Sequence, residues 1–457
     1  MGLRTLLLFF GLASGAVAQN QGITLNADEH GASVPLVRPW AVSVEGGPIE
    51  AGLGTAWQDA LRSASTECGF QGVRLSSLFA PRLRLPEEKG STGGYVYVDD
   101  VIDRVAALNL HPILELPARS PAVGALVRHI LGRYNVVEVR QWQFEIEADE
   151  PARYGAAAQA IRQSDSRLVV GSVVDCGSDP QFSRARTWLA AVHAAGAPLD
   201  FLSLSGAASP LESAVTAAQS ALADAGYRGA SVNVIRWPSA ASGPDFSHDE
   251  FPLADFVLRA NLTPPAGLAA LSYWRLCDLP MDPGPVSGVL RGGPGLITFQ
   301  GIVKPAYHAY RYLNALGEDI LASVPGGIVT RRKQSGRLVA LAYNYPDGVP
   351  TCPPFAATLA DAERLTAAGS PRPFSITLTG LKPEGQILIE WVDPQHANAA
   401  EAWRQMGSPE APGRQALESL RSSARGGVIE YRQSDDAGHF SDSRMLPPWG
   451  MLLLREL

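Results

Sequence analysis

Four carboxylates gather within one short segment, residues 141–151, whose sequence is QWQFEIEADEP. They are Glu145, Glu147, Asp149 and Glu150. Apolar and polar residues alternate at the start of the segment, which predicts a strand that ends in acids before Pro151. Such a cluster suits general acid/base hydrolysis of a glycosidic bond, which needs one carboxyl kept protonated by its surroundings. A solvated acidic loop has the same pattern, so this segment alone leaves both interpretations open.

The elements around this segment alternate between strand and helix patterns from residue 40 to about residue 317. Strands are expected over 40–44, 71–78, 111–116, the stretch from Trp142 to Ile146, 167–174, 199–204, 230–237 and 268–275. Helices are expected over 97–108, 122–134, 156–163, 185–195, 213–225 and 253–261. This alternation predicts a (β/α)8 TIM barrel, whose catalytic groups lie at the carboxyl ends of the strands. A dinucleotide-binding fold is disfavoured because no G-x-G-x-x-G follows the first strand.

The sequence changes character beyond residue 317, where short strands alternate with loops rich in Pro and Gly. Strands are expected over 337–343, 374–378, 386–392, 427–431 and 451–454, with one helix over 413–422. This pattern predicts an all-β sandwich domain over residues 318–457. The strand-like residues 22–27 are expected to pair with that sandwich, so residues 19–39 form an N-terminal segment that precedes the barrel of residues 40–317.

The first eighteen residues have the pattern of a secretory signal peptide. Arg4 precedes a short apolar run from Leu6 to Phe10, and Ala16-Val17-Ala18 forms an A-x-A cleavage site. The apolar run is too short to cross a bilayer, and no later run reaches about 20 residues. We therefore expect a cleaved signal, a secreted or periplasmic protein and no membrane span.

Composition and spacing exclude several classes of partner. The net charge is −7 and no basic stripe with interleaved aromatic residues is present, so nucleic acid is not an expected partner. The four cysteines contain no C-x-x-C pair and the eight histidines no H-x-x-x-H spacing, so neither a metal nor a cofactor is expected. Export would permit a disulfide, but its pairing stays open, buried free thiols being an equal alternative. The oligomeric state stays open as well.

Several segments, in order and spacing, make the chain similar to a known family. It resembles glycoside hydrolase family 39, the group of β-xylosidases and α-L-iduronidases. The similar segments are 126–145, 271–274, 291–296, 301–317, 392–410 and 446–453. The resemblance covers essentially the whole mature chain, and implies a barrel followed by a sandwich and a carbohydrate ligand, with β-xylosides or related glycans as the substrate class.

The family's acid/base motif is altered in this chain. Family members carry F-E-V-W-N-E-P, in which the second Glu is the acid/base, whereas the run from Phe144 to Pro151 is one residue longer and lacks the Trp-Asn pair. Alignment on Pro151 gives the acid/base position to Glu150 and the Asn position to Asp149. Alignment on Phe144 gives the acid/base position to Asp149. Glu150 is favoured, because a bulge at a barrel rim can absorb one residue.

The nucleophile motif departs further. Family members carry T-E-W-N, and this chain has Ile235-Arg236-Trp237-Pro238, so Arg236 occupies the position of the nucleophilic Glu. A guanidinium group stays cationic and cannot attack an anomeric carbon. Two histidines of the family's R-x-H-G and S-T-H motifs are replaced by Ser76 and Ser205.

The resemblance also implies a set of substrate-binding residues, which are Arg74, Glu115, Trp237, Tyr273 and Trp274. We further expect Arg236 to form an ion pair with Glu150 and so to close the catalytic site that the family resemblance implies. Loss of one partner of such a buried pair would destabilise the fold by roughly 3–5 kcal/mol.

Three functions follow from these departures. The first is a family relative that binds carbohydrate with lost or impaired retaining catalysis. The second is an active β-glycosidase that uses Glu150 with a displaced second carboxylate, for which Asp245, Asp249 and Glu250 are the candidates. The third is a scaffold or assembly protein without a carbohydrate function.

Overall fold

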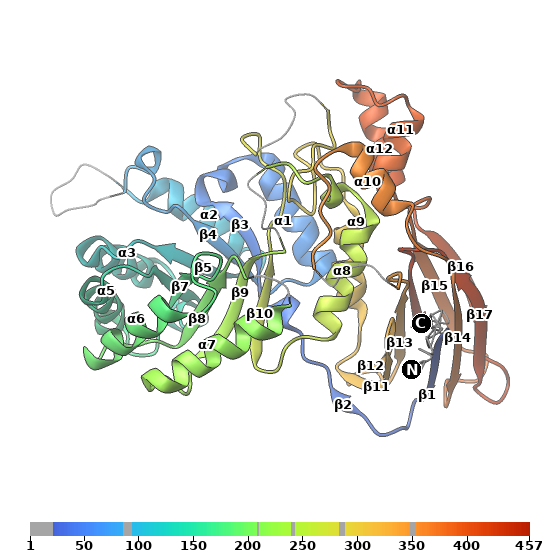
Figure 1. Cartoon of the computed structure of the whole chain (residues 1–457), viewed down its shortest axis with the longest axis horizontal. Helices are drawn as coiled ribbons and strands as arrows, with labels where there is room; N and C mark the ends of the chain where they lie inside the picture. Colours follow the sequence, from blue (N-terminus) through green and yellow to red (C-terminus); the bar gives the residue numbers. More distant parts are fainter. Residues whose placement is uncertain (1–21, 86–93, 208–209, 239–242, 283–287, 348–351) are drawn as a thin grey trace, which may run out of the picture.

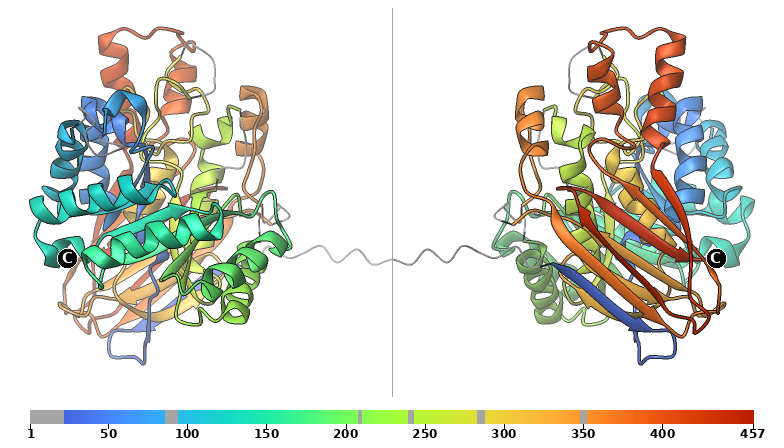
Figure 2. Two further views of the ribbon diagram at one scale, coloured as in Figure 1. Left: turned by 90° about the vertical axis from the view of Figure 1, so that its left-hand side faces the viewer. Right: turned by 90° about the vertical axis from the view of Figure 1, so that its right-hand side faces the viewer.

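The computed structural model describes residues 22–85, 94–207, 210–238, 243–282, 288–347 and 352–457. The chain forms a barrel of parallel strands surrounded by helices and, beside it, a domain of two β-sheets (Figures 1 and 2). This arrangement confirms the predicted fold class of a TIM barrel followed by a β-sandwich.

The barrel is closed by eight parallel strands in the order β10-β3-β4-β5-β6-β7-β8-β9. Their bounds are Val44–Pro48 (β3), Gly72–Ser76 (β4), His111–Leu116 (β5), Gln143–Glu147 (β6), Val169–Asp175 (β7), Phe201–Ser205 (β8), Ser231–Trp237 (β9) and Leu268–Tyr273 (β10). The last strand closes on the first where Tyr273 lies opposite Val44. All eight carboxyl ends therefore meet at one face, which we call the barrel mouth.

Helices and short 3-10 turns connect these strands. The helices are Thr55–Cys68 (α1), Val96–Ala106 (α2), Ser120–Arg133 (α3), Val136–Val139 (α4), Pro151–Ser164 (α5), Ser183–Ala194 (α6), Leu211–Ala225 (α7), Phe251–Leu262 (α8) and Pro305–Ala315 (α9). The 3-10 turns are Pro39–Ala41 (η1), Ile49–Leu53 (η2), Pro81–Leu83 (η3) and Phe246–Asp249 (η4). A proline lies in the first turn of α3, α5, α8 and α9, where its missing N–H costs no intrahelical bond.

The first barrel strand begins later than the sequence predicts. A strand was expected over 40–44, but Pro39 opens the turn η1 and β3 starts at Val44. Pro39 fixes its own φ and suits the first position of a helical turn better than a strand. A Cβ on Gly46 would lie 2.8 Å from Val73 Cγ2, so β3 and β4 pack closely there.

The second domain is built from two sheets, with strand orders β1-β14-β17 and β16-β15-β18-β13-β12-β11-β2. The strands are Ile23–Asp28 (β1), Val34–Pro35 (β2), Asp319–Val324 (β11), Gly327–Arg331 (β12), Leu338–Tyr343 (β13), Arg372–Thr379 (β14), Gln386–Val392 (β15), Val428–Gln433 (β16), Phe440–Leu446 (β17) and Met451–Glu456 (β18). Apolar residues of both sheets form one shared core. The helices here are Leu359–Thr366 (α10), Ala399–Gln405 (α11) and Arg414–Arg425 (α12).

The N-terminal segment contributes two of these strands. β1 runs parallel to β14, with Ile23 opposite Phe374 and Asp28 opposite Thr379, and buries Ile23 and Leu25 in the shared core. The short β2 pairs with β11 in the larger sheet. The segment thus adds a strand to each sheet before the chain enters the barrel (Figure 1).

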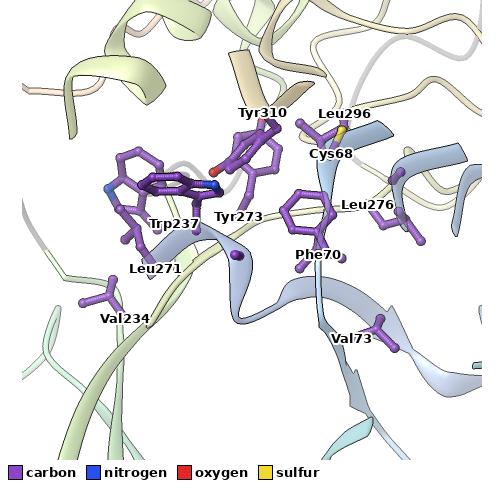
Figure 3. Packing of buried hydrophobic residues seen from close by; sticks show 14 of the residues in the cluster. Cys68, Phe70, Val73, Val234, Trp237, Leu271, Tyr273, Leu276, Leu296 and Tyr310 are labelled. Atoms are coloured by element: carbon purple, nitrogen blue, oxygen red, sulfur yellow. The ribbon is translucent and has the colours of Figure 1, made fainter. Parts of the chain in front are cut away.

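Aromatic residues fill the space between the last barrel strand and the helices that cover it. Tyr310 of α9 lies with its ring centroid 5.2 Å from that of Phe70 and 5.5 Å from that of Tyr273 (Figure 3). All four cysteines are free, and Cys68 is buried in this core. The helices within the described ranges are all too short or too polar to span a bilayer.

Candidate functional site

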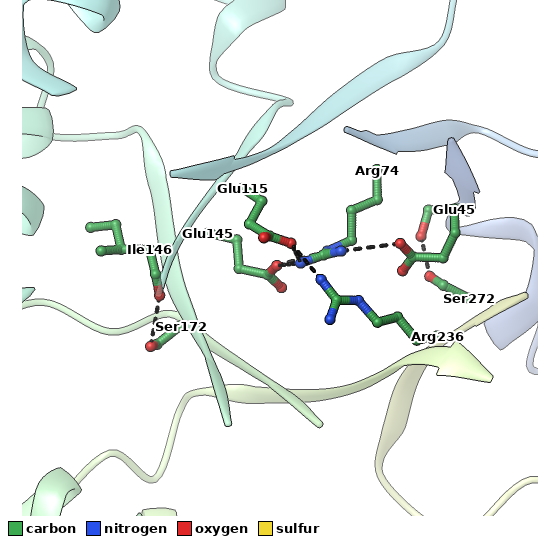
Figure 4. A network of polar contacts seen from close by, with 9 residues as sticks. Glu45, Arg74, Glu115, Glu145, Ile146, Ser172, Arg236 and Ser272 are labelled. Atoms are coloured by element: carbon green, nitrogen blue, oxygen red, sulfur yellow. Dashed lines mark hydrogen bonds and ion pairs between the residues drawn. The ribbon is translucent and has the colours of Figure 1, made fainter. Parts of the chain in front are cut away.

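Arg74 of β4 lies inside the barrel, among carboxylates from three other strands (Figure 4). Its Nη1 donates a hydrogen bond to Glu45 Oε2 at 3.0 Å, and its Nε donates to Glu145 Oε2 at 2.7 Å. Its Nη2 donates to Glu145 and to Glu115. Arg74, Glu45 and Glu145 are buried, with at most 1% of each side chain exposed. We call these four residues the Arg74 cluster.

Arg236 extends the Arg74 cluster toward solvent. It is the penultimate residue of β9, and its Nη2 donates to Glu115 Oε2 at 3.1 Å (Figure 4). Its side chain is 40% exposed, and its φ of 55° is in the left-handed region that non-glycine residues rarely adopt. Its guanidinium carbon also lies 5.7 Å from the centroid of the Trp274 ring, within cation–π range.

Burial and charge act in opposite directions within the Arg74 cluster. Burial raises the pKa of Glu45, and Arg74 lowers it in part. Burial alone would lower the pKa of Arg74, but the carboxylates of Glu145, Glu45 and Glu115 raise it well above its ordinary value. Oε1 of Glu45 and Oε1 of Glu145 are buried and accept no hydrogen bond from any described residue. The cluster therefore keeps unused acceptor capacity beside a firmly charged guanidinium.

A pocket of about 700 Å³ opens above this cluster, at the carboxyl ends of β5, β6, β7, β8 and β9. Its charged lining residues are Glu115, Glu147, Asp175, Asp179, Arg184 and Arg236. Trp188 of α6 forms part of the wall on the side away from the barrel axis. We call this the mouth pocket; it combines carboxylates, two guanidinium groups and one indole.

Glu147 is the carboxylate of the 141–151 segment that lines the mouth pocket. It is the last residue of β6, and its side chain forms no hydrogen bond or ion pair with the residues that the structure describes. Desolvation by the pocket walls raises its pKa, the Glu115 and Asp149 carboxylates raise it further, and Arg119 and Arg236 lower it in part. Sequence reasoning gave it no role, although it alternates with Ile146 and so shares the inward face of the strand with Glu145.

Asp149 and Glu150, the predicted catalytic pair, lie outside the lining of the mouth pocket. Glu150 is the N-cap of α5, its side chain is 69% exposed, and Oε2 lies 3.4 Å from Nε of Arg153. Asp149 accepts hydrogen bonds from the Glu150 amide at 2.8 Å and from Arg153 at 3.2 Å. Both carboxylates therefore pair with Arg153 in the first turn of α5.

The expected ion pair between Arg236 and Glu150 was wrong. Arg236 pairs with Glu115 of β5, and Glu150 pairs with Arg153 of its own helix. The reason is local: Pro151 starts α5 directly after Glu150, which turns that side chain toward the first turn of the helix. Glu115, at the carboxyl end of β5, lies within reach of both guanidinium groups.

The five residues implied as substrate-binding occupy different environments. Arg74 and Glu115 belong to the network described above. Trp237 and Tyr273 are buried, with 3% and 0% of their surfaces exposed. Trp237 packs against Phe256, and Tyr273 packs against Tyr310 (Figure 3). Trp274 is partly exposed and lies in cation–π contact with Arg236 and also with Arg275, at 5.1 Å.

The three candidates for a displaced second carboxylate are all buried and already bound. Asp245 accepts from the amides of Ser247 at 3.0 Å and Ala356 at 2.9 Å, and Glu250 accepts from Arg404 at 2.6 Å. Asp249 belongs to a second charged cluster, described next. The structure thus places none of the three in the mouth pocket.

The second cluster surrounds Lys304, which is fully buried. Its Nζ lies 2.8 Å from Asp249 Oδ1, 2.8 Å from Asp278 Oδ2 and 2.7 Å from the Gly293 carbonyl oxygen. Burial alone would lower the pKa of Lys304, but the two carboxylates raise it. We call this the Lys304 cluster; it ties η4 to the loop between β10 and α9.

Comparison with known proteins agrees with this architecture. Residues 118–438 match the model of glycosyl hydrolases family 39. A β-xylosidase of Geobacillus stearothermophilus is 23% identical over 87% of this chain and 88% of its own length.

Solved structures show the same fold. The family 39 enzyme of Xanthomonas axonopodis pv. citri superposes with a TM-score of 0.81 at 20% identity, over 97% of this chain and 99% of the other. A monomeric β-xylosidase of Caulobacter crescentus superposes with a TM-score of 0.80 at 21% identity, over 95% and 99%. Because the family model covers well over half of the sequence, the chain belongs to glycosyl hydrolase family 39.

Proposed function

We propose that this chain binds carbohydrate in the mouth pocket and does not hydrolyse it by the double displacement of a retaining glycosidase. That mechanism needs an acid/base and a nucleophilic carboxylate about 5 Å apart. The observation that carries the proposal is Arg236, which sits at the end of β9 with its guanidinium bound to Glu115 at 3.1 Å. A cation in the position that the family motif gives to the nucleophile cannot form the glycosyl–enzyme bond.

Two features of the mouth pocket support binding. Its volume of about 700 Å³ is in the range of small-molecule sites, and its wall contains an indole together with carboxylates and guanidinium groups. Glu147 forms no hydrogen bond or ion pair with the described residues and can accept hydrogen bonds from sugar hydroxyl groups. The β-xylosidases among its relatives make β-xylosides the first glycans to test.

Hydrolysis by another route is a second candidate, and the raised pKa of Glu147 favours it. A protonated carboxyl at the end of β6 could serve as a general acid, and a second pocket carboxylate could activate water in an inverting reaction. In this case Glu147, and not Glu150, would carry the acid role.

Hydrolysis of aryl β-xylosides and related aryl β-glycosides separates these functions. We expect no turnover by the wild type and none by Glu150→Gln. Turnover that is lost in Glu147→Gln but kept in Glu150→Gln would establish the second candidate. Turnover lost in Glu150→Gln would instead assign the acid role to Glu150. Turnover gained in Arg236→Glu would show that this one position removed the retaining reaction.

Calorimetric titration with xylo-oligosaccharides tests binding itself. We expect saturable binding by the wild type, and the same binding by Glu150→Gln because Glu150 lies outside the pocket lining. Absence of binding to xylo-oligosaccharides and to a panel of other β-linked glycans would overturn the proposal and favour the scaffold function.

We also propose that the protein is exported on a cleaved signal formed by residues 1–18, which lie outside the described residues. The basic start, apolar run and A-x-A site support this. N-terminal sequencing of the protein from the extracytoplasmic fraction should begin at Gln19. A product that keeps Met1 in the cytoplasm would contradict export.

A further inference from the structure

We propose that the ligand is a neutral sugar whose ring stacks on Trp188, at the α6 side of the mouth pocket, and not on Trp274 near the barrel axis. The inference rests on the proposed carbohydrate binding and deepens it by naming the platform and the ligand class. Three independent observations support this proposal. They are the contacts that Trp274 makes with cations of the protein, the position of Trp188 in the mouth pocket, and the charge of the residues that line the pocket.

Trp274 is already occupied by groups of the protein itself. Guanidinium carbons of Arg236 and Arg275 lie 5.7 Å and 5.1 Å from its ring centroid. Arg236 is held by Glu115 at 3.1 Å, and Arg275 is buried and held by Asp282. Trp274 is absent from the described lining of the mouth pocket. A sugar that stacked there would have to displace a cation that an ion pair holds in place.

Trp188 lines the mouth pocket and is held in one orientation. Its Nε1 donates to the Asp149 carbonyl oxygen at 2.6 Å, and its ring meets that of Tyr154 at 5.0 Å with an interplanar angle of 71°. The hydrogen bond satisfies the polar edge of the indole, and the ring is partly buried against the core, so the part of its apolar surface that lines the pocket is available to a sugar face. A fixed ring also loses little side-chain entropy when a ligand binds.

Oxygen acceptors in the same pocket suit the hydroxyl groups at a sugar's edge. Glu147 forms no hydrogen bond or ion pair with the described residues, and Asp175 uses only Oδ1 among them, which accepts from the Gly177 amide at 2.9 Å. Both lie at carboxyl ends of neighbouring strands, β6 and β7. Hydroxyl groups of a sugar can donate to these carboxylates while its ring covers Trp188.

The charge of the lining selects the ligand class. Four carboxylates line the mouth pocket, at Glu115, Glu147, Asp175 and Asp179, against two guanidinium groups at Arg184 and Arg236. Arg236 is paired to Glu115, and with this pair set aside three carboxylates, at Glu147, Asp175 and Asp179, remain against Arg184. A uronate would meet an excess of like charge, whereas a neutral pentose or hexose would not.

Calorimetry with xylotetraose compares the two tryptophans directly. We expect Trp188→Ala to weaken binding by about tenfold or more, the ratio that corresponds to ~1.4 kcal/mol. Trp188→Phe, which keeps a ring, should lose less than Trp188→Ala, and Trp274→Ala should lose less than either. Equal losses at the two positions, or a larger loss at Trp274, would overturn the proposal.

Two further measurements keep the test independent of folding. In NMR spectra of the protein with 15N-labelled tryptophan, the indole signal of Trp188 is the one that is missing from the spectrum of Trp188→Phe. We expect this signal to shift in the wild type when xylotetraose is added. An unshifted signal in a protein that binds would overturn the platform. A glucuronate-substituted xylo-oligosaccharide should bind no tighter than xylotetraose, and tighter binding would overturn the neutral ligand class. A wild type that binds none of these sugars would instead remove the proposed function itself.

Discussion

The Arg74 cluster and the Lys304 cluster each gather carboxylates around a buried cation, but only the Arg74 cluster extends to a partly exposed residue. Lys304 has three N–H donors, and Asp249, Asp278 and the Gly293 carbonyl supply three acceptors, all of them buried. The Arg74 cluster continues through Glu115 to Arg236, whose side chain is 40% exposed and lines the mouth pocket.

The two clusters differ in their access to solvent: the Lys304 cluster is buried throughout, whereas the Arg74 cluster reaches the mouth pocket through Arg236. In the Lys304 cluster each of the three acceptors lies within 2.8 Å of Nζ, but Asp249 Oδ1 forms an ion pair without an aligned hydrogen bond. The open Arg74 cluster leaves Oε1 of Glu45, Oε1 of Glu145 and Nε of Arg236 without partners among the described residues. Buried polar groups normally find partners, so the unused atoms beside the mouth pocket support the proposed ligand site there.

Removal of Arg74 should have the largest effect on stability. Arg74→Met would leave Glu45 and Glu145 buried without their cation, and we expect unfolding free energy to fall by roughly 3–5 kcal/mol. Urea unfolding measures this. A loss below about 1 kcal/mol would show that the cluster is hydrated in the native state.

Removal of Lys304 should cost nearly as much but leave sugar binding intact. Lys304→Met would leave Asp249 and Asp278 buried without their cation, so we again expect the unfolding free energy to fall by roughly 3–5 kcal/mol. The triple change Lys304→Met, Asp249→Leu, Asp278→Leu should recover much of it, since no unpaired charge remains. A folded Lys304→Met protein with weakened xylotetraose binding would break the distinction between the two clusters.

Asp255 in α8 contrasts with both clusters, because it is a buried carboxyl whose two oxygens have no hydrogen-bond partner among the described residues. Burial raises its pKa well above the ordinary value, so the folded chain keeps this proton after the unfolded chain has lost it. Stability should therefore fall as pH rises above about 4, the pKa of an unfolded Asp. Asp255→Asn should remove that slope and melt higher than the wild type at pH 8, with the difference shrinking toward pH 4. An unchanged slope in thermal melts would contradict this.

Substitution of Arg236 should have the smallest effect on stability. Its pair with Glu115 is partly exposed, so Arg236→Gln should change unfolding free energy by less than about 1 kcal/mol. This small change replaces the larger loss of stability that was expected from the sequence for a buried ion pair between Arg236 and Glu150. Glu150→Gln is the matched surface control and should have the same melting temperature as the wild type. A loss above about 3 kcal/mol in Arg236→Gln would place Arg236 with the buried part of the cluster.

The sequence predicted the fold well, because barrel strands buried on both faces are apolar runs with breakers at their ends. Among the elements it missed are α1, β11, β12 and β17; in β17, Phe440 and Leu446 are buried at the two ends and the residues between them are mostly polar. The site was harder to predict. Arg236 and Glu115 are 121 positions apart, and only the barrel geometry brings them together. Glu147 could have been found from strand alternation, whereas Trp188 lies on a helix that carries no motif.

The pairing of β1 with β14 determines the order in which the chain can be completed. Thr24 and Ser375, which hydrogen-bond across these strands, are 351 positions apart. At ~5–20 residues per second, the ribosome needs on the order of 20–70 s to travel that distance. Ile23 and Leu25, buried in the finished protein, pack on β11 and β12 as well as on β14, so their native cover stays incomplete until β14 has been made. The barrel can close first, and the nascent N-terminal strand offers chaperones an apolar target until synthesis is nearly finished.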